Sequence, residues 1–388
     1  MSALRLNVTE GIVLTSNIKK NALSRRGMLR ASGAALLSAG VEPTFAIGMP
    51  QEGPTTPKLA MYISTTPSDA EIRRIKQIGI NHVDIPEMPP LPWTEEFFRA
   101  RMDKMKAQGM SLGIVMIPWS TNNAMDPDFL KIVHGLPGRD DMIEKVKASI
   151  HVAGKVGLPV IEYDFFPYRA MEGYVYEPGR GGAIIPRFNY DRMRNLPASS
   201  EGAVTYDQVW ENLTYFLKAV IPVAESSNVR MCVHPNDPPP AISHGSGQVL
   251  NSLADWKRLI EIVDSPSNGL TFDCGVTREL GEDPVAVCRY FASRDRMNHM
   301  HFRNVRMQVP REKYTEVFPD EGEDDMYAVM REVVRNKYNR LILPEHPLDI
   351  DVDRELPKEY SRYTGWAYNI AYARAMLQAA LEDQTRNQ

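Results

Sequence analysis

Four short segments each carry a side chain that can bind a transition metal. They are Val-His-Pro at His234, Phe-Asp-Cys-Gly at Cys274, Met-His-Phe-Arg-Asn at His301 and Leu-Pro-Glu-His-Pro at Glu345. Two imidazoles, a thiolate and a carboxylate complete the protein shell of one divalent ion such as manganese, zinc, iron or cobalt, and the thiolate disfavours magnesium and calcium. The four residues are too far apart in sequence for a local metal finger. The pattern therefore predicts a metalloenzyme.

Polar residues follow two of these expected ligands. Arg303 and Asn304 come directly after His301, and Asn236 and Asp237 follow His234. An arginine beside a metal ion is suited to clamp a carboxylate, because its guanidinium can form paired charge-assisted hydrogen bonds. We expect these four residues to bind a small, oxygen-rich, anionic substrate.

Two further residues are candidates for proton transfer. His346 follows Glu345, and an imidazole beside a metal ion can act as an acid or a base. Tyr363 precedes the last expected helix, where its hydroxyl could also move a proton. His299 is one strand period from His301, so it should face the same side of its strand and lie deeper, either as a partner of the ligands or as a core residue.

Strand-like and helical patterns alternate from about residue 57 onward. Short apolar runs predict strands at 59–63, 82–85, 112–117, 158–163, 230–234, 269–273, 297–302 and 340–343. Helical spacing, capping residues and terminal glycines predict helices at 68–78, 94–108, 139–156, 205–227, 253–263, 285–293, 325–337 and 364–381.

Eight such strand–helix units predict a (β/α)8 TIM barrel of the xylose-isomerase-like kind, with a doubly wound open sheet as the alternative. Catalytic residues of such barrels gather at the carboxyl ends of the strands. The four expected ligands fall at the ends of the fifth to eighth strands, so the barrel would bring them to one rim. The barrel and the metal site therefore support each other.

The fourth expected strand and the segment after it leave two questions open. Glu162 and Asp164 end that strand, and they are either solvated rim charges or part of a changed pocket, including an extra ligand. The connection 165–200 is long, and loops of that length are typical of lids or subunit contacts. We expect a homo-oligomer, with this connection as the candidate contact.

The first 46 residues look like an export signal. Ser-Arg-Arg-Gly-Met-Leu-Arg at 24–30 is similar to the twin-arginine motif, and a short, weakly apolar stretch follows at 31–41. Small residues at 44–46 predict cleavage after Ala46, which leaves 47–388 as a single catalytic barrel in the periplasm. No later run is long and apolar enough to span a membrane. The net charge of −4 disfavours nucleic acid as a partner.

Several motifs resemble those of the mannonate dehydratase family. Residues 231–239 are similar to its "CIHPDDPP" segment, 268–275 to "NGLTLCxGS" and 301–305 to "HLRNV". Residues 322–326 resemble "GDVDM", 343–347 stand where the family has "RPDHG", and Tyr363 stands near its "GY". The similarity covers roughly residues 57–382 and is strongest after 228.

This resemblance implies a manganese enzyme that converts D-mannonate to 2-keto-3-deoxy-D-gluconate. It implies that His234, Cys274, His301 and Glu345 hold the metal and that His346 and Tyr363 transfer protons. The sequence has Glu345 where the family has aspartate. A sugar epimerase, isomerase or lyase on the same barrel, and a periplasmic carbohydrate-binding protein with a structural metal, remain alternatives.

Overall fold

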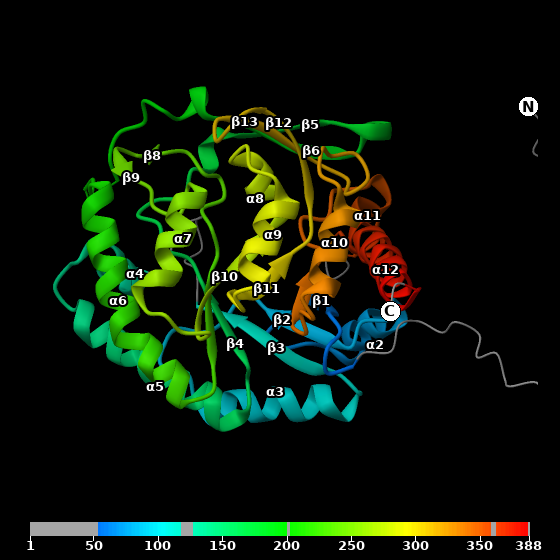
Figure 1. The fold of residues 1–388 in the computed structure, drawn as a ribbon, viewed down its shortest axis with the longest axis horizontal. Helices are drawn as coiled ribbons and strands as arrows, with labels where there is room; N and C mark the ends of the chain where they lie inside the picture. The colour runs from blue at the N-terminus through cyan, green and yellow to red at the C-terminus, as the bar shows by residue number, and fades with distance from the viewer. Residues whose placement is uncertain (1–52, 118–126, 200–201, 358–361, 387–388) are drawn as a thin grey trace, which may run out of the picture. The chain divides into compact units, whose positions relative to one another are not determined.

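Eight parallel strands close into a barrel in the computed structural model, which describes residues 53–117, 127–199, 202–357 and 362–386 (Figure 1). Around the barrel the strand order is β1-β14-β11-β10-β7-β4-β3-β2. The strands are β1 Lys58–Tyr62, β2 His82–Ile85, β3 Ser111–Met116, β4 Val160–Tyr163, β7 Arg230–Val233, β10 Asn268–Asp273, β11 Met297–His301 and β14 Leu341–Leu343. The predicted barrel is thus confirmed, and the open sheet is wrong because β1 pairs with both β2 and β14.

Helices surround the barrel, and most begin where the sequence predicts. They are α2 Asp69–Gln77, α3 Glu95–Ala107, α4 Pro127–His134, α5 Arg139–Val156, α6 Tyr206–Ser226, α7 Leu253–Ile262, α8 Cys274–Glu279, α9 Pro284–Ala292, α10 Met326–Arg335, α11 Asp351–Glu355 and α12 Tyr363–Arg386. Ser68 and Thr94 accept hydrogen bonds from the first turns of α2 and α3, which satisfies backbone donors that a helix start leaves unpaired. The helix α4 was not predicted.

A second sheet, also not predicted, joins two hairpins that leave the barrel at different strands. The connection after β4 holds β5 Tyr174–Pro178 and β6 Ile184–Asn189, with the short turns η1 Met171–Gly173, η2 Arg180–Gly182 and η3 Tyr190–Arg192. The segment after β11 forms β12 Asn304–Val309 and β13 Lys313–Val317. The antiparallel order is β12-β13-β6-β5, and Figure 1 labels these strands together at one edge. A small hairpin, β8 Ile242–Ser243 with β9 Ser246–Gly247, follows β7.

Apolar residues of the helices and the outer strand faces form the main core. Phe129, Phe165, Phe216 and Tyr163 pack edge to face, and all four are fully buried. Such rings bury large apolar areas and fix the strand ends against the helices. The barrel interior near the carboxyl ends is polar instead, with buried acids and histidines from β2, β4, β10 and β11. This polar interior is where the candidate site lies.

The described residues contain no helix that is both long and apolar enough to cross a lipid bilayer. The expected export signal at 1–46 lies outside the described residues.

Candidate active site and metal centre

A cavity of about 620 Å³ opens at the carboxyl ends of the barrel strands. Its walls include Glu162 and Asp164 after β4, His234 and Asp237 after β7, His301 at the end of β11, and Glu345 and His346 after β14; Tyr62, Pro86, Glu87, Met88, Met116 and Arg169 complete it. Parallel strands that end at one rim bring these residues together although the sequence separates them widely.

His301 Nδ1, in the wall of this cavity, lies at the spacing of metal ligands from atoms of His234, Asp273 and Glu345. His234 Nε2 lies 3.1 Å from His301 Nδ1, and each of these nitrogens lies 3.6 Å from Asp273 Oδ2. Glu345 Oε1 lies 3.5 Å from His301 Nδ1. Metal–ligand bonds of about 2.0–2.2 Å in a tetrahedron place ligands about 3.3–3.6 Å apart. His234, Asp273, His301 and Glu345 therefore fit a metal ion.

Unsatisfied polar atoms support this fit. Glu345 Oε1 is buried and accepts no hydrogen bond among the described residues, although Arg303 Nε lies 3.2 Å away as an ion pair. A buried carboxylate oxygen without a hydrogen bond is costly, and a bound cation would offset that cost. Although burial works to raise them, the neighbouring cations hold the pKa values of Asp273 and Glu345 well below their usual range. Both acids are thus ionised, as metal ligands must be.

Cys274 does not take part in this arrangement. It is the first residue of α8 and fully buried, and burial raises its thiol pKa well above the ordinary value. It belongs to none of the groups of three or more possible ligands among the described residues, whereas its neighbour Asp273 does. Asp273 ends β10 with its carboxylate 3.6 Å from His234 and His301, whereas Cys274 already belongs to α8. The structure therefore corrects the predicted thiolate ligand to the carboxylate of Asp273.

The family motif also points to Asp273 when its residues are aligned from Asn268, the first residue that the motif and this chain share. In "NGLTLCxGS" the cysteine is the sixth residue, and the sixth residue from Asn268 in this chain is Asp273. Asp273 thus occupies the position of the motif's cysteine. The motif position therefore indicates Asp273, whereas matching by residue type selects Cys274, one residue later.

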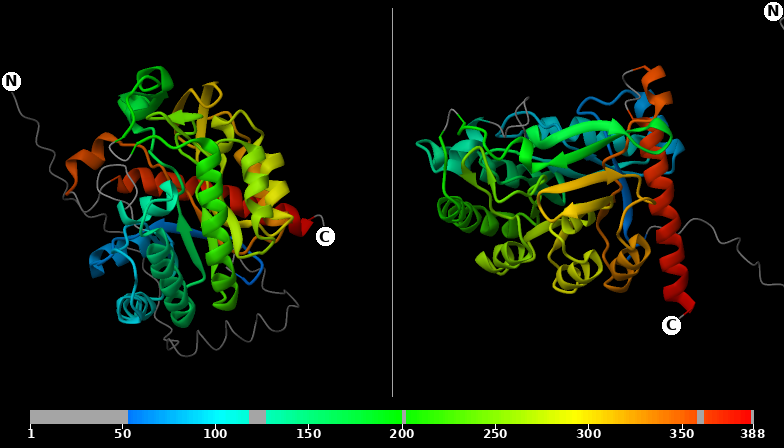
Figure 2. Two further views of the ribbon diagram at one scale, coloured as in Figure 1. Left: turned by 90° about the vertical axis from the view of Figure 1, so that its left-hand side faces the viewer. Right: turned by 90° about the horizontal axis from the view of Figure 1, so that it is seen from above.

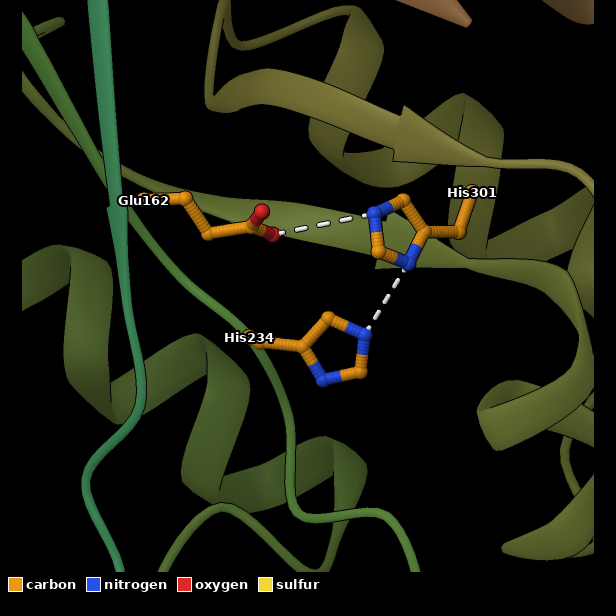
Figure 3. Close-up of side chains that lie close together, drawn as sticks. All are labelled: Glu162, His234 and His301. Carbon is orange, nitrogen blue, oxygen red and sulfur yellow. Dashed lines mark hydrogen bonds and ion pairs between the residues drawn. The ribbon is translucent and has the colours of Figure 1, made fainter. Parts of the chain in front are cut away.

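Glu162 lines the cavity beside His234 and His301 and forms a second group of possible ligands with them, and His299 lies next to it. Glu162 is 2% exposed, so the reading as a solvated rim charge is wrong. Figure 3 shows Glu162 and His234 directed at opposite nitrogens of the His301 ring, and the Glu162 Oε1–His301 Nε2 distance is 3.8 Å. His299 Nδ1 lies 3.6 Å from the same oxygen, deeper in the barrel as predicted. A carboxylate behind a metal-bound histidine fixes the orientation of its ring.

Arg303 is buried among acids. Its three guanidinium nitrogens donate to Asp273 at 2.9 Å, Glu279 at 2.9 Å and Asp237 at 3.0 Å, and Nε also lies 3.2 Å from Glu345. A guanidinium shared among carboxylates in this way holds them in place, and Arg303 is 3% exposed and not among the described residues that line the cavity. The structure thus makes Arg303 a positioning residue, in place of the predicted substrate clamp.

The three other predicted substrate-binding residues differ in whether they reach the cavity. Asp237 lines the cavity, accepts from Arg303 and also lies 3.2 Å from the Tyr174 and Tyr314 hydroxyls. Asn236 donates to Gln248, and Asn304 donates to the main-chain oxygens of 319 and 324. Neither asparagine is among the described residues that line the cavity. Only Asp237 of these residues therefore faces the space where a substrate would bind.

His346 is held between two carboxylates. Its Nδ1 lies 2.6 Å from Glu316 Oε2, and its Nε2 lies 3.1 Å from Glu345 Oε2. Both ring nitrogens face acceptors, so both carry hydrogen in this arrangement, as in an imidazolium. Its φ of +51° is in the left-handed region, which is strained for residues other than glycine and is often found at functional sites. Glu316 belongs to β13, a strand that the sequence patterns did not predict, so this contact was not expected.

Tyr363 lies away from the residues that line this cavity. Its hydroxyl donates to the main-chain oxygen of Arg74 in α2 at 2.9 Å, and its ring packs against the main core. It is not among the described residues that line the cavity, so the structure does not give it the predicted place beside the metal. Tyr62 at the end of β1 lines the cavity instead. Its position at a strand end was the one sequence feature that could have identified it.

Comparison with known proteins relates the chain to one family. The family model for D-mannonate dehydratase (UxuA) matches residues 183–388. Mannonate dehydratase from Streptococcus equi subsp. zooepidemicus is 28% identical over 258 residues, covering 60% of this chain and 71% of the relative. The protein of the same name from Lactococcus lactis subsp. cremoris is 29% identical over 292 residues, covering 66% and 78%.

Solved structures agree on the fold. Mannonate dehydratase from Streptococcus suis serotype 2 superposes with a TM-score of 0.74 at 23% identity, covering 84% of this chain and 96% of that one. A structure of L-ribulose 3-epimerase superposes with a TM-score of 0.53 at 12% identity, covering 86% and 98%. The barrel is thus of the kind predicted, and the family match over more than half of the sequence shows that the chain belongs to the D-mannonate dehydratase family of hydro-lyases.

Proposed function

We propose that the chain removes water from D-mannonate and releases 2-keto-3-deoxy-D-gluconate, at a divalent metal held by His234, Asp273, His301 and Glu345. The family match supports the reaction, and the one observation that carries the metal is that His301 Nδ1 lies 3.1–3.6 Å from atoms of His234, Asp273 and Glu345. Two imidazoles and two carboxylates suit Mn²⁺. A bound Mn²⁺ would polarise the carboxylate and hydroxyl oxygens of the substrate.

The chain's own residues can supply both proton transfers of the reaction. Dehydration breaks a C–H bond at C2 and the C–O bond at C3, so one group must accept a proton and another must donate one to the departing hydroxyl. His346 carries hydrogen on both ring nitrogens and lines the cavity, which suits the donor. Asp164 lines the same cavity, and burial raises the pKa of its carboxyl to about 7, which suits the acceptor.

The decisive assay uses Mn²⁺-loaded protein with D-mannonate and measures formation of the 2-keto-3-deoxy acid. We expect product that disappears with a chelator and falls by about 10²–10⁴-fold in His346→Asn, since that is the usual contribution of an acid–base group. The variant should still bind one equivalent of Mn²⁺, because His346 is not a ligand. Absence of product from folded, metal-loaded wild-type protein would exclude mannonate as the substrate and favour an epimerase, isomerase or lyase of another sugar.

We also propose export by the twin-arginine pathway and a homo-oligomeric state, on the strength of the Arg25-Arg26 pair and the long 165–200 connection. Replacing both arginines with lysine should keep the protein in the cytoplasm, as measured by cell fractionation. Equal periplasmic amounts of both forms would contradict export by this route. Light scattering of purified residues 47–388 would test the oligomer.

A further inference from the structure

A second cavity of about 400 Å³ adjoins the one above the metal site. Arg169 and His346 belong to the walls of both cavities, and Glu316, the partner of His346, lines the second. Pockets of about 300–1,000 Å³ usually enclose drug-sized ligands. A free six-carbon sugar acid is much smaller than such a ligand, so the two cavities together offer more room than D-mannonate needs.

The wall of this second cavity has the composition of a sugar-binding surface. Tyr174 and Tyr176 present aromatic rings, and the Tyr176 side chain is 62% exposed. Arg362, Asp349 and Glu316 bring hydrogen-bond donors and acceptors of both charges. Apolar surface comes from Met171, Ile184, Pro186, Pro347 and Leu348. A ligand with apolar C–H faces and many hydroxyls, and without net charge of its own, matches this mixture.

One side of the second cavity is formed by the β5–β6 hairpin and the turn before it, which the barrel does not require. β5 and η1 contribute Met171, Tyr174 and Tyr176, and β6 contributes Ile184 and Pro186. The family model matches from residue 183 onward, so β5 and η1 lie outside the matched part. Figure 2 shows this hairpin and the β12–β13 hairpin on the same side of the barrel. The cavity therefore lies partly outside the residues that the family model matches.

We propose that the second cavity is a subsite for a neutral sugar unit attached to the tail of the aldonic acid, so that the substrate class is an aldobionic acid. This inference rests on the proposed dehydratase function. The metal ligands and His346 define where the carboxylate end, C2 and C3 react. The remaining carbons then point past His346 and Arg169, where the second cavity begins. A sugar on one of those tail hydroxyls would occupy it.

The test compares D-mannonate with mannobionate, which is mannonate carrying a mannosyl unit on its C4 oxygen. Calorimetry on Mn²⁺-loaded enzyme gives Kd, and steady-state turnover gives kcat/KM. We expect mannobionate to bind at least tenfold more tightly and to have the higher kcat/KM. Tyr176→Ala should remove most of that advantage, while Tyr215→Ala, which changes a half-exposed tyrosine on α6 outside the cavity, should preserve it.

The two binding curves separate this inference from the proposed reaction. Turnover of mannonate without any advantage for mannobionate would overturn the subsite and leave the dehydratase intact. Tighter binding of mannobionate that Tyr176→Ala abolishes, without turnover of either acid, would support the subsite and reject the dehydratase. An equal loss of affinity for both acids in Tyr176→Ala would also overturn the subsite, because Tyr176 would then not distinguish the added sugar.

Discussion

At the scale of single residues, the site depends on which side chains face the barrel interior. Thr271 and Asp273 are two apart on β10, and His299 and His301 are two apart on β11, so each pair points inward. Asp273 thereby joins His301 and Glu345 in one group of possible ligands. Arg303 donates hydrogen bonds to Asp273 and Asp237, and its positive charge keeps these two neighbouring carboxylates ionised. A shift of one residue along β10 would replace the carboxylate ligand by a thiol.

The neighbours Asp273 and Cys274 should therefore differ in their effect on metal binding. Asp273→Ala removes a ligand and also leaves Arg303 Nε without a main partner, so we expect Mn²⁺ affinity to fall by more than 100-fold. Cys274→Ser retains all four proposed ligands and should change affinity by less than about threefold. Metal titration followed by elemental analysis measures both. If Cys274→Ser loses the metal and Asp273→Ala retains it, the thiolate of Cys274 is the ligand.

Asp164 should set the acid limb of the pH–rate profile. Burial raises the pKa of its carboxyl to about 7, so the ionised form that can accept a proton becomes the major form only above that pH. We expect kcat/KM for mannonate to rise with pH through about 7. Asp164→Asn, which cannot ionise, should lower the rate and remove this rise. A profile that keeps the same limb in the variant would assign the limb to another group.

At the scale of elements, the extra sheet positions the proton donor. Glu316 of β13 contacts Nδ1 of His346 and accepts a hydrogen bond from Tyr174 of β5 at 2.9 Å. The Tyr174 hydroxyl also lies 2.7 Å from that of Tyr314. Two hairpins that leave the barrel at distant points thus meet over one histidine. Phe188 of β6 stacks on Tyr314 with ring centroids 5.2 Å apart and holds the hairpins together.

Phe188→Ala should therefore reduce both stability and activity. Phe188 is fully buried, and truncation of such a ring costs about 3–5 kcal/mol. Because the sheet carries Glu316, we expect kcat to fall although Phe188 does not touch the site. Thermal unfolding and mannonate turnover measure the two effects. Val309→Ala, at an exposed position of β12, is the control and should change neither. If Phe188→Ala is clearly destabilised but keeps the wild-type kcat, the second sheet does not contribute to catalysis.

At the scale of the whole molecule, barrel closure concentrates negative charge. Asp84, Glu162, Asp237, Asp273, Glu279 and Glu345 are all buried in and around the polar interior near the strand ends. Arg303 is a buried arginine that forms ion pairs with four of these acids, Asp237, Asp273, Glu279 and Glu345. Such an excess of buried acid opposes folding unless a cation or proton offsets it. The metal site is thus coupled to the stability of the closed barrel.

Mn²⁺ should consequently stabilise the folded protein. A ligand that binds only the folded state adds about 2.7 kcal/mol when its concentration is 100 times Kd. We expect the midpoint of thermal unfolding to rise with Mn²⁺ and to fall after treatment with a chelator. Asp273→Ala should show little of this rise. A midpoint that is independent of Mn²⁺ in the wild-type protein would indicate that the four residues do not form a metal site.

The sequence by itself determined the barrel and part of its site. Apolar runs of strand length alternate with capped helical patterns and so specify a (β/α)8 order. The spacing of apolar residues that distinguishes a strand from a helix can be read within each short segment. The strand-end positions of His234, His301 and Glu345 followed from that order. The motif count from Asn268 also points to Asp273, but only the tertiary structure showed that its carboxylate, and not the Cys274 thiol, lies within ligand distance of His234 and His301. The contact of Glu316 with His346 and the second cavity also depend on long-range pairing of two hairpins, which no local pattern encodes.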